Sequence, residues 1–169
     1  MKAIRSFVAC ISALFISSCG YHLGGVKPAD MQGMNTFAVE MFENTTVQPN
    51  VGMLMTTAMT NTLQSDGTYS LSPREDADFI VKGTVTHIDR SSLITDTEDT
   101  YVSREIGLTV HVKYQVVERA TGKVLCQGGA SGSGSYYNQG VNTVSAMDTA
   151  LSYATRLVAE DITLNMTAI

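Results

Sequence analysis

The chain has 169 residues, of which 44% are hydrophobic and 16% charged, and its formal net charge at pH 7 is −5. This length and hydrophobic content predict one folded domain with a core of its own. The acidic balance speaks against nucleic acid and bulk anionic lipid as general partners, because both carry charge of the same sign.

The first 18 residues have the features of a secretory signal peptide. Lys2 and Arg5 supply positive charge, an apolar stretch runs over residues 7–16, and two small serines stand directly before Cys19. The apolar stretch is too short for a membrane-spanning helix, which needs about 20 apolar residues. The pattern therefore predicts a lipobox, with cleavage before Cys19 and acyl chains on that cysteine.

Cleavage at this position changes the charge and the expected location of the chain. Loss of Lys2 and Arg5 lowers the net charge from −5 to −7. The next residue is Gly20 rather than the aspartate that retains many lipoproteins at the inner membrane, so we expect an outer-membrane protein anchored on the periplasmic side. Residues 19–33 are rich in glycine and predict a lipidated tether, which leads into a single domain over residues 34–169.

The domain is predicted to begin with a strand and a helix. Alternation over residues 36–42 favours a strand with Phe37, Val39 and Met41 on one face. Turn-forming residues follow, and a helical period then predicts a helix over residues 51–66 that stops at an Asp-Gly pair. Its apolar stripe consists of Val51, Met55, Ala58, Met59, Thr62 and Leu63.

Strand patterns dominate the middle of the chain. A short strand is predicted over residues 69–71, a stronger one over 79–89, and a polar loop over 91–100. The clearest strand is 106–116, where an apolar residue recurs at every second position. A hairpin turn then leads into residues 124–137, whose first half alternates and whose Gly-Ser half is expected to be loose.

A second helix is predicted to end the domain. Ser145 and Asp148 resemble a capping box, and a helical stripe continues to about Leu164. Since short antiparallel connections dominate the middle, we expect an α+β fold. Two helices would pack on one face of a mixed, mostly antiparallel sheet of about four to five strands.

No catalytic or metal-binding motif stands out, and neither an enzyme nor a cofactor is expected. The Gly-Ser run over 128–134 matches neither a nucleophile elbow nor a dinucleotide fingerprint. His22, His87 and His111 lack ligand spacing, so no metal site is predicted. The acidic residues of the predicted loop lack the glycine and terminal glutamate of a calcium loop, which favours a solvated turn. These are Asp96, Glu98 and Asp99.

Cys126 has no expected partner within the mature chain. Cys10 leaves with the signal peptide, and Cys19 carries lipid in this interpretation. We therefore expect Cys126 to be a small buried hydrophobe, with an intermolecular disulfide as the alternative.

Two further groups are candidate contact residues. Basic side chains fall on or beside the predicted sheet, where they can form a patch for lipid phosphates or can simply be solvated strand edges. These are Lys82, Arg90, Arg104, Lys113, Arg119 and Lys123. An exposed aromatic patch at Tyr136 and Tyr137 is the candidate for partner contact.

Several segments, taken in order, resemble one known family. Residues 19–23, Cys-Gly-Tyr-His-Leu, followed by two glycines, resemble the mature start of the lipopolysaccharide-assembly lipoproteins, the LptE family. The similarity continues through four further segments. They are Phe42-Glu43-Asn44-Thr45-Thr46 with Pro49, residues 77–85, residues 114–125 around Thr121-Gly122-Lys123, and residues 154–162.

The resemblance implies a non-enzymatic subunit. Proteins of this family sit within the lumen of a large outer-membrane β-barrel, help it to assemble, and aid delivery of lipopolysaccharide to the cell surface. The partners implied are that barrel and lipopolysaccharide, and Cys19 matches the family's lipidated cysteine.

Two other functions remain open at this stage. The strand that ends in residues 42–46 before a helix also resembles periplasmic lipoproteins of the CsgG and LpoB type, which form a secretion pore or activate a peptidoglycan synthase. A lipid-anchored hydrolase is a third class, for which the sequence offers no catalytic group.

Overall fold

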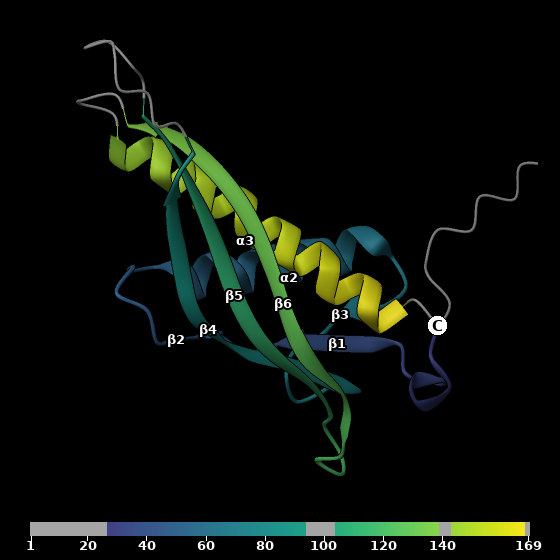
Figure 1. Cartoon of the computed structure of the whole chain (residues 1–169). Helices are drawn as coiled ribbons and strands as arrows, with labels where there is room; N and C mark the ends of the chain where they lie inside the picture. The colour runs from purple at the N-terminus through teal and green to yellow at the C-terminus, as the bar shows by residue number, and fades with distance from the viewer. Residues whose placement is uncertain (1–26, 94–103, 139–142, 168–169) are drawn as a thin grey trace, which may run out of the picture.

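Two helices cover one face of a mixed sheet in the computed structural model, which describes residues 27–93, 104–138 and 143–167 (Figure 1). Along the chain the elements are η1 (Ala29–Met31), β1 (Thr36–Val39), β2 (Glu43–Asn44), α2 (Val51–Asp66), β3 (Ser70–Leu71), β4 (Phe79–Ser92), β5 (Arg104–Glu118), β6 (Val124–Asn138) and α3 (Thr143–Thr167). The predicted α+β class is confirmed, and the sheet has six strands rather than four to five.

The sheet combines a short parallel part with a long antiparallel part. Its order is β3-β1-β4-β5-β6, and β2 also pairs with β4. β1 runs parallel to β3 and β4, whereas β4, β5 and β6 form an antiparallel meander. The meander strands are much longer than the others, so the molecule is elongated along them (Figure 1).

The first strand ends earlier than its alternation predicts. β1 stops at Val39, and the chain rejoins the sheet only as the two-residue strand β2. Met41 is therefore 70% exposed, and the prediction that it shares the face of Phe37 is wrong. Phe42 takes the buried position instead, with its ring against Gly83, where a Cβ atom would lie 2.5 Å from Phe42 Cε1.

The first helix has the predicted bounds. α2 spans Val51–Asp66 and ends at Gly67, whose φ of 75° suits a residue without a Cβ atom. Its stripe is buried at four of the six predicted positions, namely Val51, Met55, Met59 and Leu63. Ala58 and Thr62 are only half-buried because they lie beside the groove between the two helices.

The last strand is regular along its whole length, so the prediction of a loose Gly-Ser half is wrong. β6 pairs with β5 from Val124 to Asn138. Small residues are needed on the face that α3 covers, because a Cβ atom at Gly132 would lie 2.3 Å from Ala154 O and one at Gly134 would lie 2.6 Å from Ala150 O. The helix backbone thus rests almost directly on the strand.

The second helix is longer than predicted at both ends. α3 spans Thr143–Thr167, so Ser145 lies inside the helix and the predicted capping box with Asp148 is wrong. The carbonyl of Ser145 instead accepts a hydrogen bond from the Thr149 hydroxyl at 3.0 Å. Among the described residues, no helix is long and apolar enough to cross a membrane.

The core lies between the sheet and the helices. Alternate residues of β4 and β5 point into it, including Phe79, Val81, Val110 and Val112. Phe79 packs between Phe37 and Tyr69, with ring centroids 6.3 and 4.9 Å away. We call this side of the sheet the helix face. The opposite side, to which the intervening residues point, is the open face.

Candidate functional sites on the open face of the sheet

The open face is polar and lightly charged. Residues on it alternate with core residues in each strand, and β6 contributes mainly Gly, Ser and Gln. Its members on the three long strands include Lys82, Thr84, His87, Asp89, Thr109, His111, Lys113, Gln115, Gln127, Gly129, Ser131, Ser133, Ser135 and Tyr137. Because α2 and α3 cover the other side, these side chains are the part of the sheet that a partner or ligand can reach.

Two of the predicted basic residues share one hollow. Lys82 and Lys113 line a groove of about 690 Å³ on the open face, where Thr84 pairs with Lys113 across the strands. Both side chains are exposed, and neither ammonium has an ion-pair partner among the described residues. Glu40 and Glu43 also line the groove, so two carboxylates stand beside the two cations. We call this hollow the lysine groove.

The other predicted basic residues are dispersed, so a single basic patch is not formed. The Arg90 guanidinium points to the helix side, where it donates to Gln48 Oε1 at 3.0 Å. Lys123 lies at the β5–β6 turn, 3.7 Å from Asp30 Oδ1. Arg119 donates to the Ala77 carbonyl at 2.7 Å, and Arg104 begins β5 at the opposite end of the meander.

The two candidate tyrosines lie on opposite faces. Tyr136 is only 7% exposed and belongs to the core, whereas Tyr137 is 51% exposed on the open face. An exposed patch made of both residues is therefore wrong, because neighbours in a strand point to opposite sides. Tyr137 alone remains available for contact.

Cys126 is half-buried rather than buried. It is a free thiol that packs against the edge of the core, with its Sγ 4.0 Å from Tyr114 Oη. Burial raises the pKa of Tyr114 to about 12, and the neighbouring Cys126 contributes to the increase.

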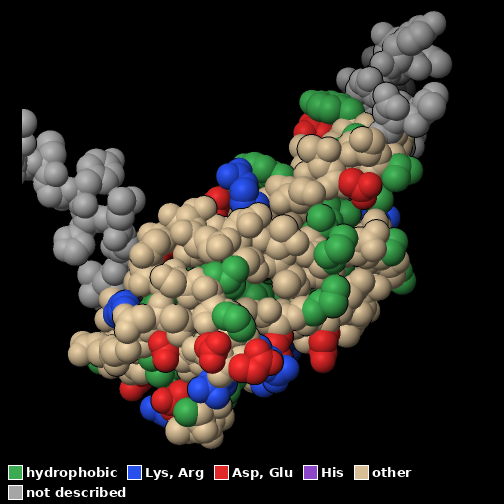
Figure 2. All heavy atoms as spheres, turned by 180° about the vertical axis from the view of Figure 1, so that it is seen from behind, with side chains coloured by type: hydrophobic (Ala, Val, Ile, Leu, Met, Phe, Trp, Pro, Cys, Tyr) green, Lys and Arg blue, Asp and Glu red, His purple; other side chains and the backbone are tan. Residues whose placement is uncertain are grey.

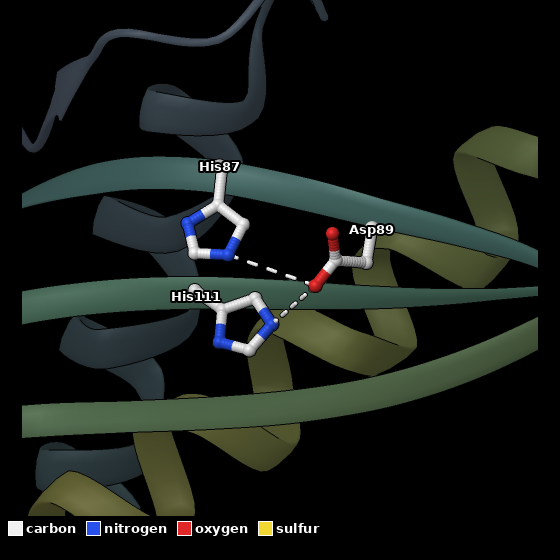
Figure 3. Close-up of side chains that lie close together, drawn as sticks. All are labelled: His87, Asp89 and His111. Carbon is white, nitrogen blue, oxygen red and sulfur yellow. Dashed lines mark hydrogen bonds and ion pairs between the residues drawn. The ribbon is translucent and has the colours of Figure 1, made fainter.

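Two histidines and an aspartate form a compact cluster on the open face (Figure 3). His111 Nε2 lies 3.0 Å and His87 Nε2 lies 3.6 Å from the same oxygen, Asp89 Oδ2. The imidazole rings are stacked, with centroids 4.1 Å apart and planes 7° from parallel. Within the described residues, this is the one group of three or more potential metal ligands. We call it the histidine cluster.

A β-bulge brings the cluster together. Val85 pairs with Val112 and His87 pairs with His111, so Thr86 is an extra residue in β4. Without it, strict alternation would place His87 on the helix face with Val85. The spacing of the histidines contains no sign of this arrangement. A signal does exist, since Val85 and Ile88 are apolar residues three apart and so break the period of two.

The helix side carries a separate, less polar hollow. A groove of about 820 Å³ runs between α2 and α3 and is lined by residues such as Met53, Leu54, Ala58 and Leu164. Figure 2 shows this side from behind, with uncharged and hydrophobic side chains over most of it and charged ones mainly along the lower edge. One ion pair, Arg156 to Glu160 at 3.3 Å, lies within the groove.

Several predicted features lie outside the described residues. They are the lipobox with Cys19, the resembling residues 19–25 with His22, and the acidic loop residues Asp96, Glu98 and Asp99.

The comparisons with known proteins agree on a family and a fold. A family model described as "LptE: Lipopolysaccharide-assembly" matches residues 34–166. A search of curated proteins found no match.

Many solved structures share the fold at low sequence identity. A homologue of a neuraminyllactose-binding hemagglutinin from Helicobacter pylori is 12% identical, with a TM-score of 0.53 over 86% of this chain and 90% of that one. Protein XCC0632 from Xanthomonas campestris is 9% identical, with a TM-score of 0.52 over 83% and 88%. A minor lipoprotein from Acinetobacter baumannii is 17% identical, with a TM-score of 0.49 over 80% and 94%.

Proposed function

Because the chain belongs to the LptE lipopolysaccharide-assembly family, we propose that it is a lipid-anchored outer-membrane subunit that assists assembly of, and plugs, a β-barrel lipopolysaccharide translocon. The observation that carries this proposal is the family match, which extends from residue 34, before β1, almost to the end of α3. The role requires binding and shape rather than a catalytic group.

The proposed anchor is the lipidated Cys19. Two or more acyl chains on this residue would hold the protein stably at a membrane, since a single chain gives only marginal binding. The described chain supports a short tether: Lys27 Nζ donates to Met34 O at 2.7 Å and to Asn35 Oδ1 at 2.8 Å. The tether is thus fastened to the domain just before β1.

The anchor is tested by mass spectrometry of the protein from the membrane fraction. We expect a mature N-terminus at Cys19 that carries acyl mass, and a Cys19→Ala variant without it. An N-terminus elsewhere, or an unmodified Cys19, would contradict the anchor.

The open face supports contact with the inside of a barrel. The lumen of an outer-membrane barrel is polar, so a subunit that occupies it must present groups that exchange water for protein hydrogen bonds. Along β6 the open face offers the hydroxyls of Ser131, Ser133 and Ser135 without a charge. We propose that this surface, with Tyr137 at its end, faces the barrel wall.

The lysine groove supports contact with lipopolysaccharide phosphates. Lys82 and Lys113 present two exposed ammonium groups, and hydrogen bonds between such groups and phosphate are charge-assisted. A Lys82→Gln, Lys113→Gln double variant should bind lipopolysaccharide about tenfold more weakly, the equivalent of one such hydrogen bond. Lys123→Gln, at the distant turn, is the matched control. Equal binding by both variants would remove the groove from the proposal.

The cellular role is tested by depletion of the protein. We expect less lipopolysaccharide at the cell surface and an immature barrel when the chain is depleted, with recovery on re-expression. Normal surface lipopolysaccharide together with normal barrel maturation would contradict the assembly role. If peptidoglycan synthesis failed instead, the LpoB-type function would be favoured.

A further inference from the structure

We infer that the histidine cluster is a binding site for a single first-row divalent transition-metal ion, with Zn²⁺ as the ion of choice. His87, His111 and Asp89 supply two imidazole nitrogens and one carboxylate oxygen from adjacent strands (Figure 3). Imidazole and carboxylate are ordinary ligands of zinc, and three protein ligands leave a coordination position for water or for a group on a partner.

The backbone is shaped to present these three ligands on one surface. The bulge at Thr86 turns His87 to the open face, directly opposite His111, and Asp89 follows on the same side while Ile88 returns to the helix face. Bulges are common beside functional sites because they redirect a side chain at the cost of ladder hydrogen bonds. A purely structural β4–β5 pairing would not need this extra residue.

Thr86 also selects the nitrogen that is free to bind. Its hydroxyl donates to the His111 carbonyl at 3.1 Å, because a carbonyl oxygen can only accept. The same hydroxyl lies 3.2 Å from His87 Nδ1, and its hydrogen is already engaged. Neutral His87 must therefore donate from Nδ1, which leaves a bare lone pair on Nε2.

That lone pair faces negative charge. His87 Nε2 lies 3.6 Å from Asp89 Oδ2, and the neutral ring has no hydrogen to place between the two atoms. Two electron-rich atoms in this position are held together favourably by a cation. The cation is either a proton or a metal ion, and the other two ligand atoms make the metal ion the better fit.

The distances suit one ion. Zinc bonds to nitrogen and oxygen of about 2.0–2.2 Å place tetrahedral ligand atoms about 3.3–3.5 Å apart. The two nitrogen-to-oxygen distances here are 3.0 and 3.6 Å, and all three ligand atoms lie within 4.8 Å of one another. The parallel rings must tilt toward each other to direct both lone pairs at the ion. Their side chains are 59% and 32% exposed, which leaves room for that rotation.

The site is tested by metal titration of the full-length chain purified in detergent and freed of metal. Zn²⁺ is titrated in competition with a chromophoric chelator, and Co²⁺ is added separately to record its visible absorption. We expect one ion per chain and a Co²⁺ spectrum of low coordination number. His87→Asn and His111→Asn should each weaken Zn²⁺ binding by more than about tenfold, since even residues that only orient a ligand contribute that much.

Three controls separate the site from general effects. His22→Asn, which changes the remaining histidine of the chain, should leave binding unchanged. Asp89→Asn removes a ligand at an exposed position, so its loss of binding does not depend on folding. Thr86→Val should weaken binding about tenfold while the Co²⁺ absorption of the loaded protein persists, as expected for a positioning residue.

Either of two results would overturn the site. One is a wild-type chain that binds no Zn²⁺ in competition with the chelator. The other is unchanged affinity in the His87→Asn, His111→Asn double variant with a native circular dichroism spectrum. Because the titration measures metal binding alone, its failure leaves the lipopolysaccharide-assembly proposal intact.

Discussion

The two faces of the same sheet follow different rules. Val110 and His111 are neighbours in β5, yet Val110 is fully buried beneath the helices and His111 lies in an exposed cluster on the other side. The helix face is filled by apolar side chains and by close backbone contact with α3, which leaves little freedom to change. The open face carries the hydroxyls, lysines and histidines, where substitutions alter binding rather than folding.

The largest contrast in stability should come from removing an aromatic core residue. Phe79→Ala removes the ring that packs between Phe37 and Tyr69 and should lower the free energy of unfolding by about 3–5 kcal/mol. Val117→Ala, on the open face, should cost less than about 1 kcal/mol, because that side chain is only half-buried. Urea unfolding followed by circular dichroism measures both values. Equal losses would show that the open face carries as much packing as the helix face.

A matched pair of glycines tests the close approach of α3. Gly132→Ala should destabilise by about 1–3 kcal/mol, because its Cβ atom would lie 2.3 Å from the Ala154 carbonyl oxygen. Gly129→Ala, on the open face of the same strand, meets only Val112 O at 3.7 Å and should change stability by less than about 0.5 kcal/mol. Thermal unfolding of the two variants gives the comparison. A destabilised Gly129→Ala with an unaffected Gly132→Ala would place the helix elsewhere.

The smallest contrast is in pH dependence. Burial raises the pKa of Tyr114 from 10.0 to about 12. Its contribution to stability is therefore complete below about pH 10 and is lost as the pH rises through 12. Tyr114→Phe should reduce this alkaline loss, but not abolish it, because burial also raises the pKa of Tyr69. Tyr137→Phe, on the open face, is the control, and urea midpoints at pH 8 and pH 11 provide the measurement.

Periodicity predicted the fold class well because it follows from burial. The alternation of β5 and the helical stripe of α2 both reflect sides that face the core, and both elements were confirmed close to their predicted bounds. It failed where a single residue shifts the register. β1 ends at Val39 so that Phe42, rather than Met41, is buried.

The rest of the molecule depends on contacts between distant segments. The Gly-Ser half of β6 has weak strand propensity, and it is regular because α3 needs small residues beneath it. The histidine cluster joins residues that are 22 apart in the chain, through a strand register that one sequence does not reveal. The basic residues shared a sheet, as expected, but only Lys82 and Lys113 share a groove, because strand parity and position separate the others.

The central claim is that this chain is a subunit of a lipopolysaccharide translocon, and co-purification tests it most directly. The full-length, tagged chain is isolated from outer membranes solubilised in mild detergent, and its partners are identified by mass spectrometry. We predict one large outer-membrane β-barrel in equimolar amount. Recovery of a peptidoglycan synthase, or of a ring of identical copies without a barrel, would contradict the claim.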